Sequence, residues 1–97
     1  MLVDLFIHGV DSDDIPTIGN YFRSELKYNE LVFIGSKKIS IKTKQPHSKA
    51  RIHAALKEVK RNLISKYPNL EIEVIGRYRN GEYRMYMSKD RLDFRDI

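Results

Sequence analysis

SKARIHAALKEVKRNLISKY, residues 48–67, carries the strongest periodic pattern of the chain. Its large apolar residues recur every three or four positions, which is the repeat of one helical face. That stripe consists of Ile52, Leu56, Val59, Leu63 and Tyr67, with Ala55 at its edge. Ser48 suits the N-cap because its hydroxyl can accept a hydrogen bond from a free N–H of the first turn, and Pro68-Asn69 ends the pattern. The stretch therefore predicts a helix that buries one face against another element.

A β-hairpin is predicted directly after this helix, with strands over residues 70–78 and 82–88. Asn80-Gly81 lies between them and favours a two-residue turn, because both positions of that turn adopt positive φ. The turn sets the register of the inward-facing pairs, which are Tyr78–Tyr83, Gly76–Met85 and Val74–Met87. The opposite face of the hairpin then carries Ile75, Arg77, Arg79, Arg84 and Tyr86.

The first half of the chain predicts the same alternation of strand and helix. Residues 1–8 alternate as a strand. A helix is expected to begin in the acidic segment 11–14 and to run to about Lys27. Its buried face consists of Ile15, Ile18, Phe22 and Leu26. Residues 30–34 and 38–44 are extended, either as a hairpin or as one long bent strand, and Gln45-Pro46 ends them.

These elements predict an α+β fold in β-α-β(β)-α-β-β order. Two helices with one buried stripe each are best covered by one sheet face, which gives a two-layer sandwich with both helices on one face of a mixed sheet. Residues 1–97 form a single domain, with a polar tail from about Lys89.

Charge is the most informative feature of the composition. The 97 residues carry a net charge of +5, and 32% of them are charged. Residues 1–30 carry a net charge of −4, whereas residues 31–91 carry +10. Such asymmetry predicts a basic face that attracts phosphate or another anionic partner.

Several protein classes are disfavoured by the same composition. The chain has no cysteine, which excludes disulfides and thiolate metal sites and fits a cytoplasmic protein. Its longest apolar run, Leu31–Ile34, is too short to span a membrane. Phosphate-binding loops, serine elbows and zinc-ligand spacings are absent from the sequence, and the segment 11–14 is interpreted as a helix start rather than a metal loop. We therefore expect no catalytic residues, metal or cofactor.

The sheet face opposite the helices is the leading candidate for a binding site. The period of two places cations and rings together on it, and a face of this kind can hold single strands by stacking bases and tracking phosphates. Its predicted contact residues are Phe6, Lys42, Lys44, Arg77, Arg79, Arg84 and Tyr86. One flank of the second helix adds Lys57, Lys60 and Arg61.

Residues 5–10, Leu-Phe-Ile-His-Gly-Val, resemble the first-strand signature of the RNA-recognition-motif domains. The resemblance implies the same order of elements and a base stacked on Phe6. The third-strand signature of that family needs a glycine and two rings, and residues 37–42 have neither. The order of elements from about Leu31 to Lys89 is also similar to the carboxy-terminal domain of the third bacterial translation initiation factor, another RNA-binding family.

The sequence predicts a non-enzymatic nucleic-acid-binding module, for RNA or single strands rather than specific duplex sites. The alternative is a small protein-interaction or regulatory subunit, able to self-associate, whose acidic and basic surfaces dock a partner and whose edge strands can pair with one.

Overall fold

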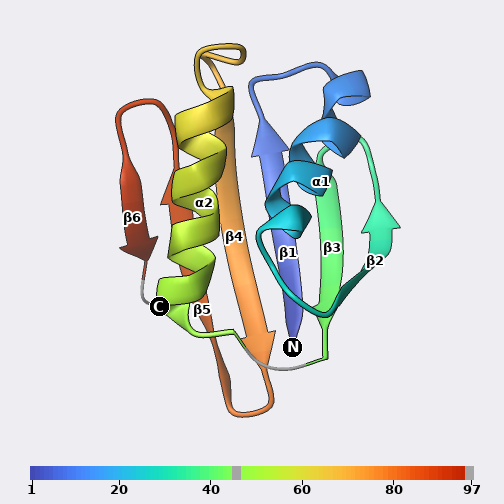
Figure 1. Cartoon of the computed structure of the whole chain (residues 1–97). Coiled ribbons are helices and arrows are strands. Elements are labelled where there is room, and N and C mark those ends of the chain that lie inside the picture. The colour runs from blue at the N-terminus through green and yellow to red at the C-terminus, as the bar shows by residue number, and fades with distance from the viewer. Residues whose placement is uncertain (45–46, 96–97) are drawn as a thin grey trace.

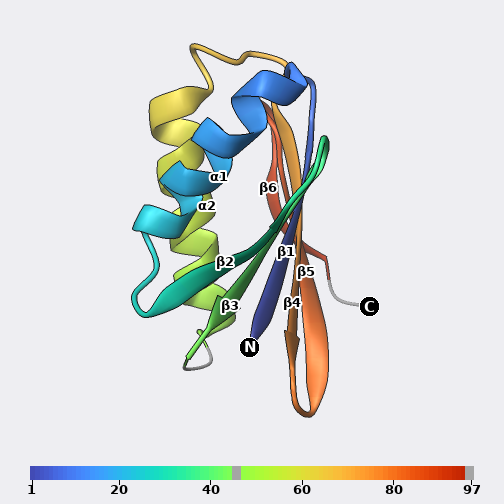
Figure 2. The same ribbon diagram turned by 90° about the vertical axis from the view of Figure 1, so that its right-hand side faces the viewer.

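The computed structural model describes residues 1–44 and 47–95, and it places two helices on one face of a six-stranded sheet (Figure 1, Figure 2). The strands are β1 (Leu2–His8), β2 (Asn29–Ile34), β3 (Lys38–Thr43), β4 (Glu71–Tyr78), β5 (Gly81–Met87) and β6 (Leu92–Arg95). The helices are α1 (Ile15–Ser24), which follows the short 3-10 helix η1 (Ser12–Asp14), and α2 (Lys49–Leu63). The predicted α+β class is confirmed.

The sheet has the strand order β2-β3-β1-β4-β5-β6, and every pairing among the described strands is antiparallel. The prediction of a mixed sheet was therefore wrong. The reason is the crossovers. α1 joins β1 to β2 and α2 joins β3 to β4, and both pairs of strands run parallel to each other. In each pair an antiparallel strand lies between the two, so no parallel pair becomes adjacent.

The core lies between the helices and the inner sheet face. The predicted inward residues of β1, which are Val3, Leu5 and Ile7, are all buried, as are Ile52, Leu56 and Val59 of α2. Burying a large aliphatic side chain contributes about 1.5–3 kcal/mol. The apolar stripes read from the sequence therefore hold the two layers together, and they leave the other sheet face uncovered by helices (Figure 2).

The helix ends differ from the expected ones. Ser48 caps α2 as predicted, since its Oγ accepts a hydrogen bond from the Arg51 N–H at 3.2 Å. The helix ends at Leu63 rather than Tyr67, and α1 ends at Ser24 rather than Lys27. A hydrophobic stripe continues to be buried after the backbone has left the helix, as Leu26 shows.

Two further expectations are settled by the strands. Residues 29–43 form a hairpin rather than one bent strand, since β2 pairs with β3. The tail is not entirely irregular, because Leu92–Arg95 adds β6 to the edge of the sheet beside β5. The predicted strand end at Gln45-Pro46 and the last two residues of the tail lie outside the described residues.

The register of the last hairpin is shifted from the predicted one. Tyr78 pairs with Gly81, and Gly76 pairs with Tyr83, so Arg79 and Asn80 form the turn. Neither Asn80 nor Gly81 has positive φ. The physical reason is the bare face of Gly76, which the Tyr83 ring covers so closely that a Cβ there would lie 2.6 Å from the ring. A shift of two residues preserves the faces, so the inward and outward sets stay as predicted.

This register predicts that Gly81→Ala changes the free energy of unfolding by less than about 0.5 kcal/mol, because ordinary φ and space for a Cβ make it a tolerated surface change. Gly76→Ala serves as the comparison and should cost about 1–3 kcal/mol by overpacking against Tyr83. Urea unfolding of the two variants measures both values. A loss above about 1 kcal/mol for Gly81→Ala would instead indicate a turn at Asn80-Gly81 with positive φ.

Candidate nucleic-acid interface

The outer sheet face carries the predicted residues Arg77, Arg84, Tyr86 and Phe6, and each of them has a partner within the protein. The Arg77 Nε lies 3.6 Å from a carboxylate oxygen of Glu82, and the Arg84 Nη1 lies 3.7 Å from one of Glu73. On this face, residues on neighbouring strands bear opposite charges, and such cross-strand pairs stabilise an antiparallel sheet. The face therefore presents paired charges rather than an open basic patch.

A buried carboxylate fixes the centre of this face. Asp4 is only 2% exposed, although β1 points it away from the helices. Its Oδ1 accepts a hydrogen bond of 2.6 Å from the Ser40 hydroxyl, and its Oδ2 accepts one from the Arg77 guanidinium. Buried charge is tolerated only when it is paired and hydrogen-bonded. Arg77 is thus the counter-ion of Asp4, which is a structural role.

The two rings of the outer face are also engaged. The Lys38 Nζ lies 5.5 Å from the centroid of the Phe6 ring, and the guanidinium of Arg91 lies 5.2 Å from that of Tyr86. The Tyr86 hydroxyl donates a hydrogen bond of 2.9 Å to Glu71, and this bond raises the pKa of Tyr86 above its ordinary value. A base that stacks on either ring must displace a cation already placed against it.

A second group of predicted residues lies on one flank of α2. Helical spacing aligns Lys57 and Lys60 with Lys49 and His53 along this flank, and Arg61 borders it. Arg51, on the other flank, donates a hydrogen bond to the Glu25 carbonyl at the end of α1, so the lysine flank faces away from α1. Arg61 lies 3.9 Å from Glu58, whereas Lys57 and Lys60 have no carboxylate partner among the described residues.

The third group gathers where β2 and α2 begin and where β3 and β4 end, at the lower end of the molecule in Figure 1. Hydrogen bonds tie these segments together: the Lys44 N–H donates to the Tyr28 carbonyl at 2.9 Å, and the Tyr83 hydroxyl to the His47 carbonyl at 3.2 Å. Burial raises the pKa of Tyr83 well above its usual range and keeps that hydroxyl a donor. We call this group the basic end, and its cations are Lys27, Lys42, Lys44, Lys49, Arg51 and Arg79.

The basic end carries more cations than acids. Among the described residues, its carboxylates are Glu25, Glu30 and Glu82. Four of its six cations are exposed and have no ion pair in the described part of the chain, namely Lys27, Lys42, Lys44 and Arg79. Positive charge that is not neutralised locally is what a phosphate backbone recognises.

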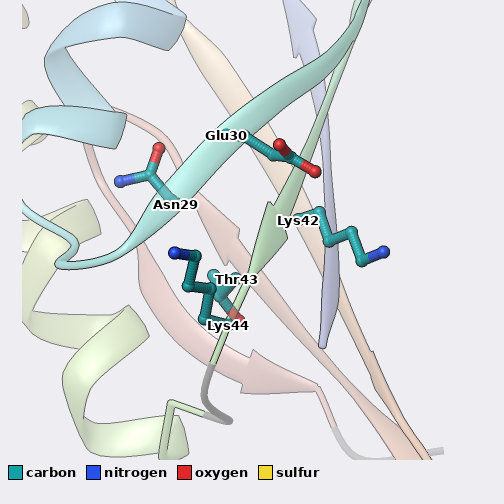
Figure 3. Close-up of a pocket in the computed structure, with 5 residues that line it drawn as sticks. All are labelled: Asn29, Glu30, Lys42, Thr43 and Lys44. Carbon is teal, nitrogen blue, oxygen red and sulfur yellow. The ribbon is translucent and has the colours of Figure 1, made fainter.

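A shallow pocket of about 340 Å³ lies within the basic end (Figure 3). Lys42 and Glu30 extend on one side of the strands, and the Lys44 ammonium points to the other side. The Asn29 amide, also in the lining, donates hydrogen bonds to the Arg23 and Leu26 carbonyls and so closes the end of α1. The cations therefore surround this end of the protein instead of converging on one small ligand.

The structure brings together three of the ten predicted residues at the basic end: Lys42, Lys44 and Arg79. Sequence reasoning missed Lys27, Lys49 and Arg51, because each lies beside a helix end, where no alternating pattern reports direction. Lys27 was further hidden by the negative balance of residues 1–30. The only signal in the sequence was the order of the elements. In an antiparallel sheet this order brings these helix ends and strand ends to the same end of the molecule.

The described ranges were found to contain neither a metal-ligand cluster nor a membrane-spanning helix. No three His, Asp or Glu side chains in them are close enough to hold a metal ion. No helix in the same ranges has the length and apolar character needed to cross a membrane. In comparisons with known proteins, the chain matches no protein-family model, no curated protein and no solved structure.

Proposed function

We propose that the protein binds the sugar–phosphate backbone of RNA or single-stranded DNA through the basic end, with the lysine flank of α2 extending the contact. The observation that carries this proposal is the group of four exposed cations without ion pairs, Lys27, Lys42, Lys44 and Arg79, at one end of the fold. Lys49 begins the flank of α2 at the same end, so a strand that leaves the basic end can follow Lys57 and Lys60.

The proposed contact is electrostatic and tolerant of sequence. Bases are read by hydrogen bonds to their edges or by stacking, and the rings of the outer face are held against cations of the protein itself. The cations surround one end of the protein, and a flexible single-stranded nucleic acid can bend to reach them. Affinity is then set by the number of phosphates neutralised.

A salt titration tests this function. A fluorescein-labelled single strand of mixed sequence, as RNA and as DNA, is bound at increasing NaCl concentration and followed by fluorescence anisotropy. The four unpaired cations of the basic end, with one phosphate each, contribute about −3 to the slope of log affinity against log salt for a single strand. Replacing Lys42, Lys44 and Arg79 together by Gln should reduce the slope by about 2 and weaken binding by more than about tenfold at low salt.

The matched control removes the same charge from the opposite end of the sheet. Lys37, Lys66 and Lys89 are exposed and belong to the β2–β3, α2–β4 and β5–β6 connections, which lie at the opposite end of the sheet (Figure 1). Their triple replacement by Gln should therefore weaken binding far less. Equal losses in the two triple variants would show that only net charge matters and would reject the basic end as the site. Absence of binding by the unmodified protein at about 50 mM salt, or a flat salt dependence, would reject the function itself.

A further inference from the structure

One edge of the sheet is apolar and uncovered. β2 is the terminal strand on the α1 side of the fold, and three consecutive residues in it are exposed: Val32 by 55%, Phe33 by 51% and Ile34 by 42%. Edge strands are ordinarily protected by charge or proline, because their free N–H and C=O groups pair readily with another strand. No charged residue or proline lies between Leu31 and Ile34.

The opposite edge is protected. β6 has four residues and contains Asp93, whose carboxylate is held by Arg91 at 2.6 Å. A short edge strand with a charge in it is a poor template for pairing. β2 therefore offers three consecutive exposed apolar residues together with a free backbone.

A β-bulge interrupts the pairing of this edge strand with β3. The register with β3 shifts between Leu31 and Phe33, so Val32 has no partner residue on β3. Phe33 pairs with Ser40, which lies on the outer face. Because no helix covers that face, both apolar side chains stay in solvent in the isolated chain (Figure 2).

The charges at the two ends of β2 favour a second copy of the chain as the partner of this edge. Glu30 begins the strand, and Lys37 and Lys38 follow its end. When two copies of β2 pair antiparallel, the start of each strand lies beside the end of the other. Pairing centred on Phe33 places Glu30 of each copy across from Ser36 of the other and next to its exposed Lys37. A two-fold axis repeats this attraction twice.

We propose that two copies of the chain associate through antiparallel pairing of their β2 strands, which joins the two sheets into one. The Phe33 side chains of the two copies then lie beside each other on the outer face, with Val32 next to them, and the backbone groups of both edges become paired. This inference does not depend on the proposed phosphate binding, because none of the cations of the basic end takes part in it; Glu30 is the only residue that the two surfaces share.

Sedimentation equilibrium between about 5 μM and 1 mM tests the proposal, with circular dichroism to confirm folding. The unmodified chain should reach the mass of a dimer within this range. Phe33→Lys should raise the dissociation constant at least about 30-fold, the effect of losing one central contact. Val32→Lys is the second variant, since Val32 has no partner on β3 and its replacement leaves the fold intact. The control Tyr78→Lys adds the same charge at another exposed ring and should leave the dimer unchanged.

A charge exchange adds an independent criterion. Glu30→Lys should weaken the dimer, and Glu30→Lys with Lys37→Glu in the same chain should restore it, because the attraction is rebuilt with the signs reversed. A monomer up to 1 mM overturns the proposal, as does a dimer that survives both Phe33→Lys and Val32→Lys. A dimer that responds to Tyr78→Lys instead would place the interface elsewhere and overturn it equally.

Discussion

Replacing Arg77 by Met is expected to lower the free energy of unfolding by about 3 kcal/mol, measured by urea denaturation at neutral pH. The substitution keeps the apolar stem of the side chain and removes only the guanidinium. Asp4 would then remain buried with the Ser40 hydroxyl as its partner and no counter-ion. An uncompensated buried charge is among the few changes that cost this much.

Two further variants separate the ion pair from the loss of positive charge as such. Lys42→Met removes an exposed cation from β3, the strand next to that of Asp4. It should lower the free energy of unfolding by less than about 0.5 kcal/mol. The double variant Asp4→Leu with Arg77→Met should recover most of the lost stability, because an apolar pair replaces a paired charge. If Arg77→Met costs less than about 1 kcal/mol, then Asp4 does not depend on Arg77, and Arg77 is available as a phosphate contact after all.

Local patterns in the sequence were sufficient to predict the layers. The helical stripes and the alternation of β1 and β4 identified most of the core, because the periods 3.6 and 2 decide which face a residue lies on. They did not show that Asp4 and Ile75 of the outer face are buried or that Tyr78 is exposed. The same argument preserved the faces of the last hairpin even though its register was wrong. Inward and outward positions of the strands could thus be read from the chain alone.

Pairings between distant residues could not be predicted in this way. Asp4 and Arg77 are 73 positions apart, and Asp4 stands in an apolar strand with no local sign of its partner. The register around Gly76 depends on the Tyr83 ring, and β6 depends on the free edge of β5. Each is a tertiary contact that overrides a local preference for a turn or a tail.

Prediction of the candidate site was limited by the same lack of information on distant contacts. Alternation correctly placed Arg77, Arg84 and Tyr86 on the outer face, yet it could not show that Glu73, Glu82 and Glu71 stand beside them. The basic end became visible only with the strand order. The uneven distribution of charge along the sequence therefore showed which segments are basic, but it did not show where their side chains lie on the surface.

Gly9→Ala is the other substitution with a large expected effect, a loss of about 3 kcal/mol or more in the free energy of unfolding. Gly9 has φ +80°, a conformation that costs a residue with a Cβ about 1–2 kcal/mol. A Cβ would also lie 1.8 Å from the Asn69 carbonyl oxygen, which is backbone and cannot rotate away. Thermal or urea unfolding of the variant measures the loss.

Gly35→Ala provides the comparison, since Gly35 lacks positive φ and its added Cβ would meet the Phe33 ring at 2.9 Å, a side chain able to move. It should cost less than about 1 kcal/mol. Equal losses in the two variants would show that close approach to Asn69 does not constrain Gly9. A large loss confined to Gly9→Ala gives this glycine a structural reason: it lets the end of β1 approach the loop after α2. The likeness of residues 5–10 to an RNA-binding signature then follows in part from packing, because Gly9 supports the fold and Phe6 lies beneath Lys38.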